Sequence, residues 1–417
     1  MSGRNGGMFS RGDLMLVTGG AGFIGSHTVD ALLERGYRVR ILDILQERVH
    51  PKGKPQWVPS DAEFIRGDAA NYQTLRRALE GVAGVFHLAA YQDYLPNFSE
   101  FVHNNTESSA LLFELIVLDR ERFPVRKIVF ASSQSVCGEG VYYCGNETEE
   151  PAGTFKPVRG EWRGAPIQER RNRAIVRPGP RSLEQLLRAE WEVQCPLCGE
   201  PMEPLLIDEG TSMPHTTYAI SKHAIEQIAA RLGQRYGIAT ACMRYTYVQG
   251  PRNSFYNAYS GIARRFALRI MSGLPPVAYE DGGQLRDYVN VGDVAKANVL
   301  ALERPETDFQ VLNVGGGRAI TVLEFARLML QQFGSKMEPE VPGEFRVGDT
   351  RHTVSDITRM RALGWEPTTP VEENIKQYVE WITQQPVPKN LLPEAEAAMK
   401  QSGVVRRARA ANAVVEQ

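Results

Sequence analysis

A tyrosine and a lysine stand four positions apart in the stretch HTTYAISKHAIEQ, residues 215–227. Positions i and i+4 are neighbours on one helix face, so Tyr218 and Lys222 can point into the same cleft. An unperturbed tyrosine titrates at about pH 10 and is a poor base at neutral pH, but a nearby ammonium group favours its phenolate form. The two residues are therefore a candidate acid–base pair, although this spacing also occurs by chance on helix surfaces.

A glycine-rich stretch, VTGGAGFIGSH at residues 17–27, is the second candidate for chemistry. Gly19, Gly22 and Gly25 follow a predicted strand and open a predicted helix, where they permit a tight turn and close approach of the backbone to a pyrophosphate. The free amides of the helix N-terminus favour an anion. Asp43 ends the next predicted strand, where a carboxylate accepts bonds from ribose hydroxyls and repels a 2′-phosphate. We therefore expect a dinucleotide site that prefers NAD to NADP.

Short apolar runs alternate with helical patterns through the first 130 residues. The predicted strands are 14–19, 37–43, 62–68, 84–90 and 126–133, with helices at 24–36 and 74–82. A helix at 216–236 and a strand at 238–248 resume the pattern later. Such alternation is typical of a parallel sheet with helices on both faces. The sequence thus predicts an α/β fold with a doubly wound parallel sheet of the Rossmann type.

The same patterns divide the chain into regions. We expect a flexible leader at 1–12 and a dinucleotide-binding domain at 13–250, which contains an inserted subdomain at 140–212. Residues 251–387 would form a smaller C-terminal α/β domain that mainly binds the substrate, and residues 388–417 a tail. The insertion is rich in Arg, Pro, Gly and Glu and has little strand signal. The tail is polar, with a helical or disordered conformation and no assigned function.

Composition excludes several classes of protein. The chain has 417 residues and a formal net charge of −1, which gives no global field for nucleic acid or a membrane surface. No apolar stretch is long enough to span a bilayer, and the first residues contain no apolar signal segment. Five cysteines are too few and too unevenly spaced for a disulfide scaffold. We expect a cytoplasmic protein that binds neither nucleic acid nor membranes.

Together these motifs resemble the extended short-chain dehydrogenase/reductases, in particular their nucleotide-sugar epimerase/dehydratase branch. The resemblance covers nearly all of residues 14–385 outside the insertion. It rests on GGAGFIG, on GDAAN (67–71), on HLAA (87–90), on FASSQSV (130–136) and on YAISK (218–222). It implies NAD as the cofactor. The implied cofactor contacts are Gly19, Gly22, Phe23, Ile24, Gly25, Asp43, Asp68, Ala69, Leu88, Ala89, Ala90, Asn105, Tyr218, Lys222 and Tyr245.

The resemblance also implies a substrate and a catalytic set. Tyr218 would remove a proton from a sugar hydroxyl while hydride leaves the same carbon for NAD⁺, Ser133 would hold that hydroxyl, and Lys222 would bond the nicotinamide ribose. The substrate would be a nucleotide-diphosphate sugar. Its implied contacts are Tyr91, Gln92, Ser133, Tyr247, and two arginines that grip the diphosphate, Arg286 in QLRDYVNVGDVA (284–295) and Arg346 in FRVGD (345–349).

The residues after Ser133 favour one reaction over others. Relatives that eliminate water or carbon dioxide carry acids directly after the catalytic Ser/Thr, because elimination needs a general acid and base beside the ring. Gln134 and Ser135 stand there instead, which favours an epimerase acting at C4 through a 4-keto intermediate. Glu139 is close enough in sequence to keep a dehydratase or decarboxylase open. A net dehydrogenase and an idle NAD-binding sensor or scaffold are further alternatives.

Among the epimerases, SSxSxxGEG, YEDGGQLRDYV (279–289) and RVGDTRH (346–352) resemble the dTDP-L-rhamnose 4-epimerase-like group. Two departures lie where sugar and pyrophosphate should bind. Tyr247 and Gln249 replace an Asn and a Tyr of the branch, and the loop YQDYLPNFS (91–99) is unusually aromatic. The sugar and the base of the nucleotide therefore stay open.

The insertion carries a candidate metal site in VQCPLCGEP, residues 193–201. A C-x-x-C sequence followed by glycine reads as a zinc knuckle, with Cys195 and Cys198 as ligands. Tetrahedral zinc needs four ligands, and Cys144, Cys137 and His215 are the further candidates. The alternative is a turn that holds two reduced thiols. We expect the insertion to act as a lid or a subunit contact near the substrate mouth.

Two apolar-faced helices suggest the assembly. SALLFELIVLDR (109–120) and the helix that starts at Tyr218 resemble the pair through which this family dimerises as a four-helix bundle. The resemblance thus implies a homodimer.

Overall fold

The structure, a computed structural model, describes residues 8–93, 96–144, 175–256, 261–388 and 390–409. Among these residues, the central feature is a seven-stranded sheet in which all neighbouring strands are parallel. The strands lie in the order β12 (Gln310–Val314), β9 (Ala239–Tyr245), β5 (Lys127–Ser133), β4 (Gly84–His87), β1 (Leu14–Thr18), β2 (Arg38–Asp43) and β3 (Glu63–Arg66). The predicted Rossmann sheet is confirmed.

Both faces of this sheet are buried, as the apolar strands predict. Successive side chains of a strand point to opposite faces, and in β1 Leu14 and Leu16 join one apolar core while Met15 and Val17 join another. Helices α1 (Phe23–Glu34) and α8 (Val291–Glu303) cover the second of these faces. The first face is covered by α2 (Tyr72–Ala78), α4 (Ser108–Leu118) and α6 (Thr217–Tyr236). Helices on both faces make the sheet doubly wound.

The helix that precedes β5 starts earlier than predicted. Helix α3 (Phe98–Phe101), a π-helical turn η1 (Val102–Glu107) and α4 follow one another without a break. A 3₁₀ turn, η2 (Gln134–Cys137), follows β5, and further short helices are η4 (Pro305–Thr307) and α10 (Thr358–Ala362).

The predicted strand 238–248 is wrong as a single element. Strand β9 ends at Tyr245, and after Thr246 the chain enters β10 (Tyr247–Gln249), which belongs to another sheet. The amide of Thr246 still bonds the carbonyl of Val314 in β12. The residues after Thr246 leave the seven-stranded sheet, so one continuous β pattern in the sequence contributes strands to two different sheets.

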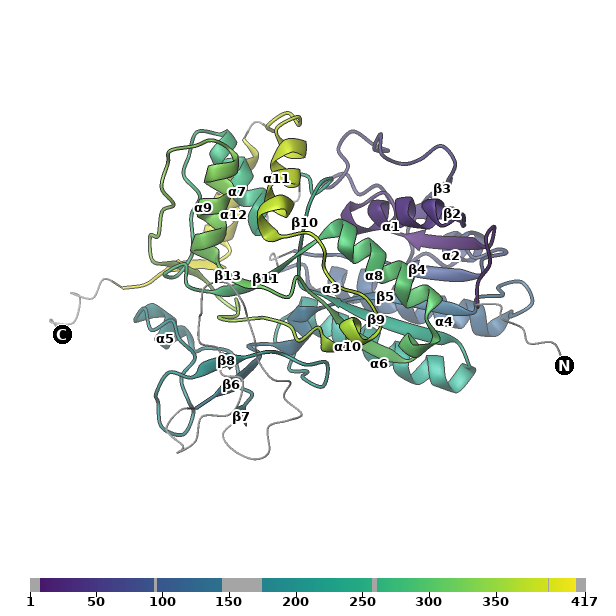
Figure 1. Ribbon diagram of the computed structural model, residues 1–417, viewed down its shortest axis with the longest axis horizontal. Helices are drawn as coiled ribbons and strands as arrows, with labels where there is room; N and C mark the ends of the chain where they lie inside the picture. The colour runs from purple at the N-terminus through teal and green to yellow at the C-terminus, as the bar shows by residue number, and fades with distance from the viewer. Residues whose placement is uncertain (1–7, 94–95, 145–174, 257–260, 389, 410–417) are drawn as a thin grey trace.

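The C-terminal region builds a second body around a small sheet, β10–β11–β13, among the described residues. Strand β11 (Leu285–Asn290) runs parallel to β10 and antiparallel to β13 (Ala319–Thr321). The helices of this body are α7 (Ile262–Met271), α9 (Val322–Gln332), α11 (Val371–Ile382) and α12 (Leu391–Gln401), which share one apolar core. Figure 1 shows them together at one end of the molecule, with α2 and α4 at the other.

The division of the chain at residue 250 does not separate the two bodies. Helix α8 and strand β12 come after that residue, yet they belong to the seven-stranded layer. The described part of the expected tail is also structured. Helix α12 packs into the C-terminal core, and β15 (Val405–Arg407) pairs antiparallel with β14 (Glu344–Arg346). The tail contributes the backbone partner of the strand that carries Arg346.

The described part of the insertion is a small lobe with its own antiparallel sheet, which corrects the expectation of little strand structure. Its strands are β7 (Ile175–Val176), β6 (Val141–Tyr143) and β8 (Glu203–Leu205), accompanied by α5 (Leu183–Leu187). Buried Tyr142, Cys144, Val193, Cys195 and Met202 form its core. Figure 1 shows the lobe beside β11 and β13, outside the helix layers of the central sheet.

Helices in the described part of the chain are too short or too polar to cross a membrane.

Candidate active site

The glycine loop between β1 and α1 has the shape that a pyrophosphate needs. Gly19 has φ +69°, and a Cβ on it would lie 2.9 Å from the backbone of Ala89. A Cβ on Gly25 would lie 2.1 Å from the carbonyl oxygen of Gly19. Among the described residues, no side chain caps the N-terminus of α1 by a hydrogen bond, which leaves its first amides available to an anion. These residues fit a dinucleotide.

Asp43 lies at the end of β2, next to the loop. Its Oδ2 accepts a hydrogen bond from the amide of Ala21 at 3.0 Å, and its Oδ1 accepts one from Leu45 at 2.8 Å. The carboxylate is thereby fixed beside the glycine loop and lines the cleft. Each carboxylate oxygen has two lone pairs, so both can still accept a bond from a ribose hydroxyl.

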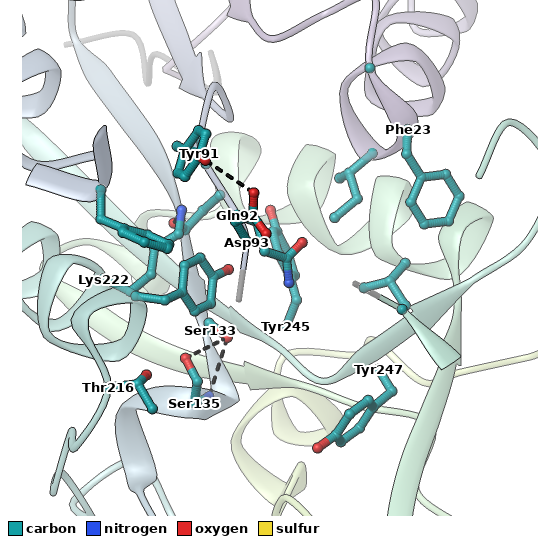
Figure 2. Close-up of a pocket in the computed structure, with 18 of the residues that line it drawn as sticks. Phe23, Tyr91, Gln92, Asp93, Ser133, Ser135, Thr216, Lys222, Tyr245 and Tyr247 are labelled. Atoms are coloured by element: carbon teal, nitrogen blue, oxygen red, sulfur yellow. Dashed lines mark hydrogen bonds between the residues drawn. The ribbon is translucent and has the colours of Figure 1, made fainter. Parts of the chain in front are cut away.

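One large cleft, of about 1280 Å³, runs across the carboxyl ends of the central strands. Ligands of open α/β sheets bind at this edge. The predicted site residues that line it are Gly19, Gly22, Phe23, Ile24, Gly25, Asp43, Asp68, Ala69, Leu88, Ala89, Ala90, Tyr91, Gln92, Ser133, Tyr218, Lys222, Tyr245, Tyr247, Arg286 and Arg346. Figure 2 shows Ser133, Lys222, Tyr245 and Tyr247 around one open space, with Phe23 across it. The structure thus brings together residues as far apart in the chain as Gly19 and Arg346.

The tyrosine and lysine stand on the first turns of α6. The side chain of Thr216 caps this helix by accepting a bond from the amide of Ala219. The Nζ of Lys222 lies 5.9 Å from the ring centroid of Tyr218 and donates to the carbonyl of Ala131 at 2.8 Å. Burial lowers the pKa of Lys222 to about 8. The two side chains share one cleft, as the spacing predicts.

Ser133 ends β5 at the wall of the same cleft. Its Oγ accepts bonds from the amide of Ser135 at 3.2 Å and the hydroxyl of Ser135 at 3.0 Å. These two bonds are dashed in Figure 2. Because Ser135 supplies donors, the hydroxyl hydrogen of Ser133 can be directed elsewhere, toward an acceptor in the cleft.

Asn105, expected to contact the cofactor, lies behind the cleft wall. It is fully buried, and its side chain bonds both the amide and the carbonyl of Tyr91, at 2.7 and 3.1 Å. Its Nδ2 also donates to the hydroxyl of Ser221 at 2.9 Å, one residue before Lys222. Because these bonds occupy both amide hydrogens, the asparagine acts in this structure by fixing the Tyr91 loop to α6.

Arg286 and Arg346 line the C-terminal side of the cleft. Arg286 donates to the carbonyls of Leu285, Thr350 and Arg351 at 2.7–2.9 Å, and its guanidinium lies 5.2 Å from the ring centroid of Tyr247. The guanidinium of Arg346 lies 5.4 Å from the ring centroid of Tyr279. Both cations are thus held at a wall of the cleft by neighbouring groups.

Three residues that follow Ser133 in the chain bear on elimination chemistry. Gln134 and Ser135 line the cleft beside Ser133. Glu139 does not, and is 1% exposed. One oxygen of Glu139 accepts from Arg181 at 3.2 Å and the other from the amide of Arg351 at 2.8 Å. Its carboxylate is engaged in the protein interior and does not face the cleft.

Several lining residues were missed from the sequence. Arg264 and Arg265, on the first turn of α7, line the cleft, and Arg265 donates to the hydroxyl of Tyr279 at 2.7 Å. Tyr279 belongs to the motif YEDGGQLRDYV (279–289), but nothing in the sequence distinguishes arginines that line a cleft from other arginines on an amphipathic helix. Residues 402–404 reach the cleft because β15 pairs with β14, a pairing that leaves no mark in the sequence.

Three cysteines of the insertion converge. The sulfur atoms of Cys144, Cys195 and Cys198 all lie within 4.8 Å of one another. Backbone amides of Cys198 and Leu197 lower the pKa of the Cys195 thiol. The other candidates lie elsewhere: Cys137 is buried against Thr211, and His215 bonds the carbonyl of Gly348. Cys144 is therefore the residue that joins the knuckle, and Cys137 and His215 do not.

The described part of the insertion contributes no residue to the cleft lining. Instead, Ile207 pairs with Ser355, and Arg181 contacts Glu280 and Asp349 behind the cleft wall. The expected lid over the substrate mouth is therefore not formed by these residues.

The fold and the cleft define an α/β protein of the Rossmann type in which the glycine loop, a serine, a tyrosine and a lysine line one cleft. The family model of the NAD dependent epimerase/dehydratase family matches residues 15–160 and 198–315. The chain therefore belongs to this family. The unmatched residues 161–197 fall inside the insertion.

Individual relatives agree with the family. The chain is 29% identical to the dTDP-L-rhamnose 4-epimerase of Burkholderia thailandensis over 386 residues, 91% of this chain and 97% of the relative. The UDP-glucose 4-epimerase of Thermotoga maritima, solved with UDP-glucose, is 28% identical, with a TM-score of 0.65 over 88% of this chain and 98% of the other. The UDP-glucose 4-epimerase of Thermus thermophilus, solved with NAD, is 28% identical, with a TM-score of 0.63 over 89% of this chain and 100% of the other.

Proposed function

We propose that the protein is an NAD-dependent 4-epimerase of a nucleotide-diphosphate sugar. The observation that carries the proposal is the site itself: Ser133, Tyr218 and Lys222 line one cleft with the glycine loop, and Gln134 and Ser135 hold the positions where eliminating relatives have acids. Bound NAD supplies a hydride acceptor and returns the hydride. The residues of this chain have only to hold the sugar and move one proton.

Tyr218 would take the proton from the C4 hydroxyl. Lys222, whose ammonium lies near the phenol, stabilises the phenolate electrostatically. Ser133 holds the C4 oxygen by a hydrogen bond through both directions of the reaction. Once the 4-keto sugar has turned within the cleft, Tyr218 would return the proton to the C4 oxygen.

The remaining contacts follow from position in the cleft. Asp43 would bond the adenosine ribose, and the amides at the start of α1 would bind the pyrophosphate of the cofactor. Arg286 and Arg346 would bind the diphosphate of the substrate, since both are cations at the opposite wall. Tyr247 would contact the sugar.

The test is turnover without added cofactor. Purified protein is incubated with UDP- and dTDP-linked hexoses, and products are separated by chromatography. We expect interconversion of C4 epimers, loss of more than about 1000-fold of turnover in Tyr218→Phe with NAD still bound, and normal turnover in Tyr236→Phe, which alters the exposed end of the same helix. Undiminished turnover in Tyr218→Phe refutes the role of that residue.

The same assay separates the alternatives. Net release of free NADH would identify a dehydrogenase, a 4-keto-6-deoxy product a dehydratase, and carbon dioxide a decarboxylase. NAD binding without turnover of any nucleotide sugar would favour the sensor or scaffold.

We also propose that the insertion binds zinc through Cys144, Cys195 and Cys198. Three convergent sulfur atoms and the amide bonds that favour a thiolate at Cys195 support this proposal. Purified protein should contain about one equivalent of zinc by elemental analysis, Cys198→Ser should lose most of it, and Cys137→Ser should keep it. A metal-free wild-type protein with normal activity would contradict the proposal.

We propose, finally, a homodimer through α4 and α6. Both helices carry exposed apolar side chains: Leu118 is 69% exposed and Ile220 is 55% exposed. Sedimentation should give a dimer for the wild type and a monomer for a Leu118→Glu/Ile220→Glu variant. The predicted cytoplasmic location stays a prediction.

A further inference from the structure

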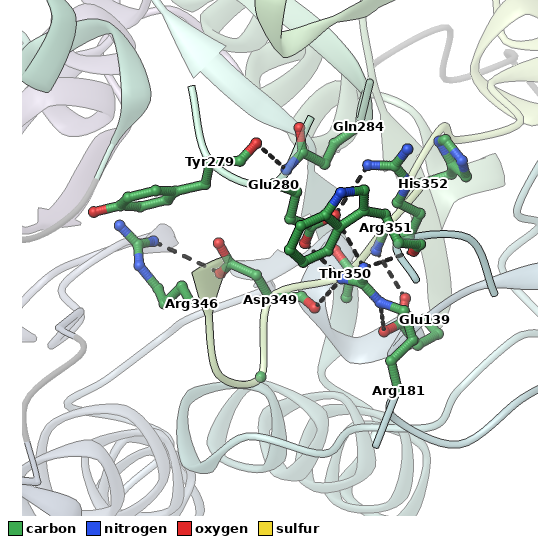
Figure 3. A network of polar contacts seen from close by, with 12 residues as sticks. Glu139, Arg181, Tyr279, Glu280, Gln284, Arg346, Asp349, Thr350, Arg351 and His352 are labelled. Atoms are coloured by element: carbon green, nitrogen blue, oxygen red, sulfur yellow. Dashed lines mark hydrogen bonds and ion pairs between the residues drawn. The ribbon is translucent and has the colours of Figure 1, made fainter. Parts of the chain in front are cut away.

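A buried network of charges joins the insertion to the C-terminal body. Its centre is formed by Glu139, Arg181, Glu280 and Arg351, whose side chains are each at most 2% exposed. Figure 3 shows the four side chains close together, with Tyr279 and Arg346 to their left. Two arginines and two glutamates balance in charge, so the centre is a neutral set of paired ions.

Arg181, from the insertion, uses all of its N–H groups in this network. Its Nε donates to Glu139 at 3.2 Å, and its two terminal nitrogens donate to the two oxygens of Glu280 at 3.0 Å. The remaining donors bond the carbonyls of Trp191 and Asp349, both at 2.9 Å. A guanidinium offers five such donors in a fixed plane, so this set of partners also fixes the orientation of the side chain.

The short segment 349–351 is held from two sides by these groups. On the insertion side, Arg181 bonds the carbonyl of Asp349, and Glu139 accepts from the amide of Arg351 at 2.8 Å. On the cleft side, the carbonyls of Thr350 and Arg351 accept from the guanidinium of Arg286 at 2.7 and 2.8 Å. The insertion therefore fixes the backbone on which Arg286 rests.

Arg351 ties the same segment to the loop beside the cleft. Its side chain donates to Glu280 at 2.9 Å and to both oxygens of Asp281 at 2.7 and 2.9 Å. Glu280 has φ +55°, a conformation that is unusual for a residue with a side chain, and its amide bonds the carbonyl of Glu344 at 2.6 Å. The ion pairs hold this strained residue directly after Tyr279, which lines the cleft.

We propose that Arg181 is a positioning residue: through Glu139 and the backbone of residues 349–351 it sets Arg286 for the diphosphate of the nucleotide sugar. This inference rests on the proposed function. Burying four charges costs desolvation that apolar residues of similar size would avoid, so stability alone does not account for the network. A need to hold a substrate-binding cation in a fixed place does account for the network, because small displacements of such a group weaken binding.

The experiment measures nucleoside-diphosphate binding by the NAD-loaded full-length protein. Titration calorimetry with UDP and with dTDP gives the dissociation constant of the more tightly bound probe. The main variant is Arg181→Met/Glu139→Gln, which removes both members of a pair so that neither is left charged without the other. Arg181→Lys keeps the charge but loses the planar donors, and Arg188→Met, which removes an exposed arginine of the insertion, is the matched control.

We expect the main variant to bind the probe about 10- to 100-fold more weakly with NAD content unchanged, and Arg181→Lys to show a smaller loss. KM for the nucleotide sugar should rise while kcat stays within about threefold. Because Arg181 acts through Arg286, adding the main variant to Arg286→Met should weaken binding by less than about threefold beyond Arg286→Met alone.

Three results would overturn the inference. One is wild-type affinity in Arg181→Lys and in the main variant. Another is a full, additive loss in the Arg286→Met background, which would show a merely structural role. The third is a wild type that binds neither probe, and this would also refute the proposed substrate class. Probe binding without epimerase turnover refutes only the proposed reaction, since the binding data still decide the role of Arg181.

Discussion

Removal of Arg244 should weaken the anchor of the catalytic helix by a predictable amount. Glu226 lies one helical turn after Lys222 on α6, and its two oxygens accept from Arg244 of β9 at 2.7 and 2.8 Å. The carboxylate is 3% exposed and also accepts from Ser132 at 2.6 Å. In Arg244→Met the carboxylate stays buried, but its only guanidinium partner in the described structure is gone.

The size of the effect follows from the pKa of Glu226. Burial acts to raise this pKa, but hydrogen bonds from Arg244, His223 and Ser132 outweigh it and lower the pKa from 4.5 to about 2. This difference corresponds to roughly 3 kcal/mol at neutral pH. Loss of one member of a buried ion pair costs about 3–5 kcal/mol in other proteins. We expect Arg244→Met to lower the free energy of unfolding by about 3–4 kcal/mol.

The pH dependence has a definite sign. In the wild type the folded pKa of Glu226 is depressed, so its stabilising contribution is complete above pH 4.5 and is lost as the pH falls toward 2. In Arg244→Met burial dominates and raises the pKa of Glu226, so the carboxylate destabilises the variant at neutral pH. The deficit should therefore shrink as the pH falls from about 8 to about 5.

Urea unfolding of NAD-saturated protein, followed by circular dichroism, measures this deficit. The control is Arg244→Met/Glu226→Met, which removes both charges and should recover more than half of the lost free energy. A deficit below about 1 kcal/mol in the single variant, or an equal deficit in the double variant, would refute the reasoning. Such results would show that Glu226 is held by its other partners or by water.

Three further predictions concern the cleft. Asp43→Ser should shift the ratio of NAD to NADP dissociation constants by more than about 10-fold toward NADP, since it removes the charge that repels a 2′-phosphate; equal ratios would contradict this. Arg48→Met should release NAD about 10-fold faster in a displacement assay, because the ion pair between Arg48 and Asp93 links the segments that follow β2 and β4 at the cleft; an unchanged rate would show that this ion pair does not retain NAD. Lys222→Met should abolish turnover yet raise the melting temperature of NAD-free protein at pH 7, because burial lowers the pKa of Lys222 to about 8 and the charged form costs stability below that pH. That gain should disappear between about pH 8 and pH 10.5, because the lysine is neutral in the folded wild type over this range and approaches neutrality in the unfolded chain.

The sequence predicted the sheet because local patterns encode it. Strands such as residues 84–90 are short, apolar and flanked by helical segments, and a strand buried on both faces needs no partner-specific signal. The glycine loop and Asp43 were equally readable, since Gly19 and Gly25 leave no room for a side chain. These features depend on few residues that are close in sequence.

Features that depend on distant pairing were predicted less well. Nothing in RYTYV marks Thr246 as the point where one strand leaves the central sheet, because both halves have the same β propensity. The tail was predicted to be helical or disordered, and the sequence did not show that Leu392 and Ala395 of α12 pack into the C-terminal core. Its composition is polar, and only the tertiary contact decides whether such a segment folds.

Arg181 shows the same limit for charged residues. It lies in an arginine-rich insertion whose charges suggest a solvated face, and only its two glutamate partners, 42 and 99 positions away in the chain, make it buried. Arg188, seven positions later, looks the same in the sequence and is exposed. The sequence pattern does not distinguish these two arginines, since a charge is buried when it has ion-pair partners in the fold, whatever residues stand next to it in the sequence.

Glu139 links the insertion to the type of reaction. From the sequence it could have been the acid of an elimination, because it stands six residues after Ser133. In the structure Arg181 and the amide of Arg351 hold both of its oxygens outside the cleft lining. Both oxygens of Glu139 are thus engaged by neighbours that lie away from the cleft. In the proposed reaction, the arginine that we infer to position Arg286 would thus also keep an acid away from the keto sugar. If this contact were lost, we would expect a looser diphosphate site and a Glu139 carboxylate with one oxygen released from its ion pair. If Arg181→Met gained measurable dehydration of a nucleotide sugar while Arg181→Met/Glu139→Gln did not, this second effect of the network would be established.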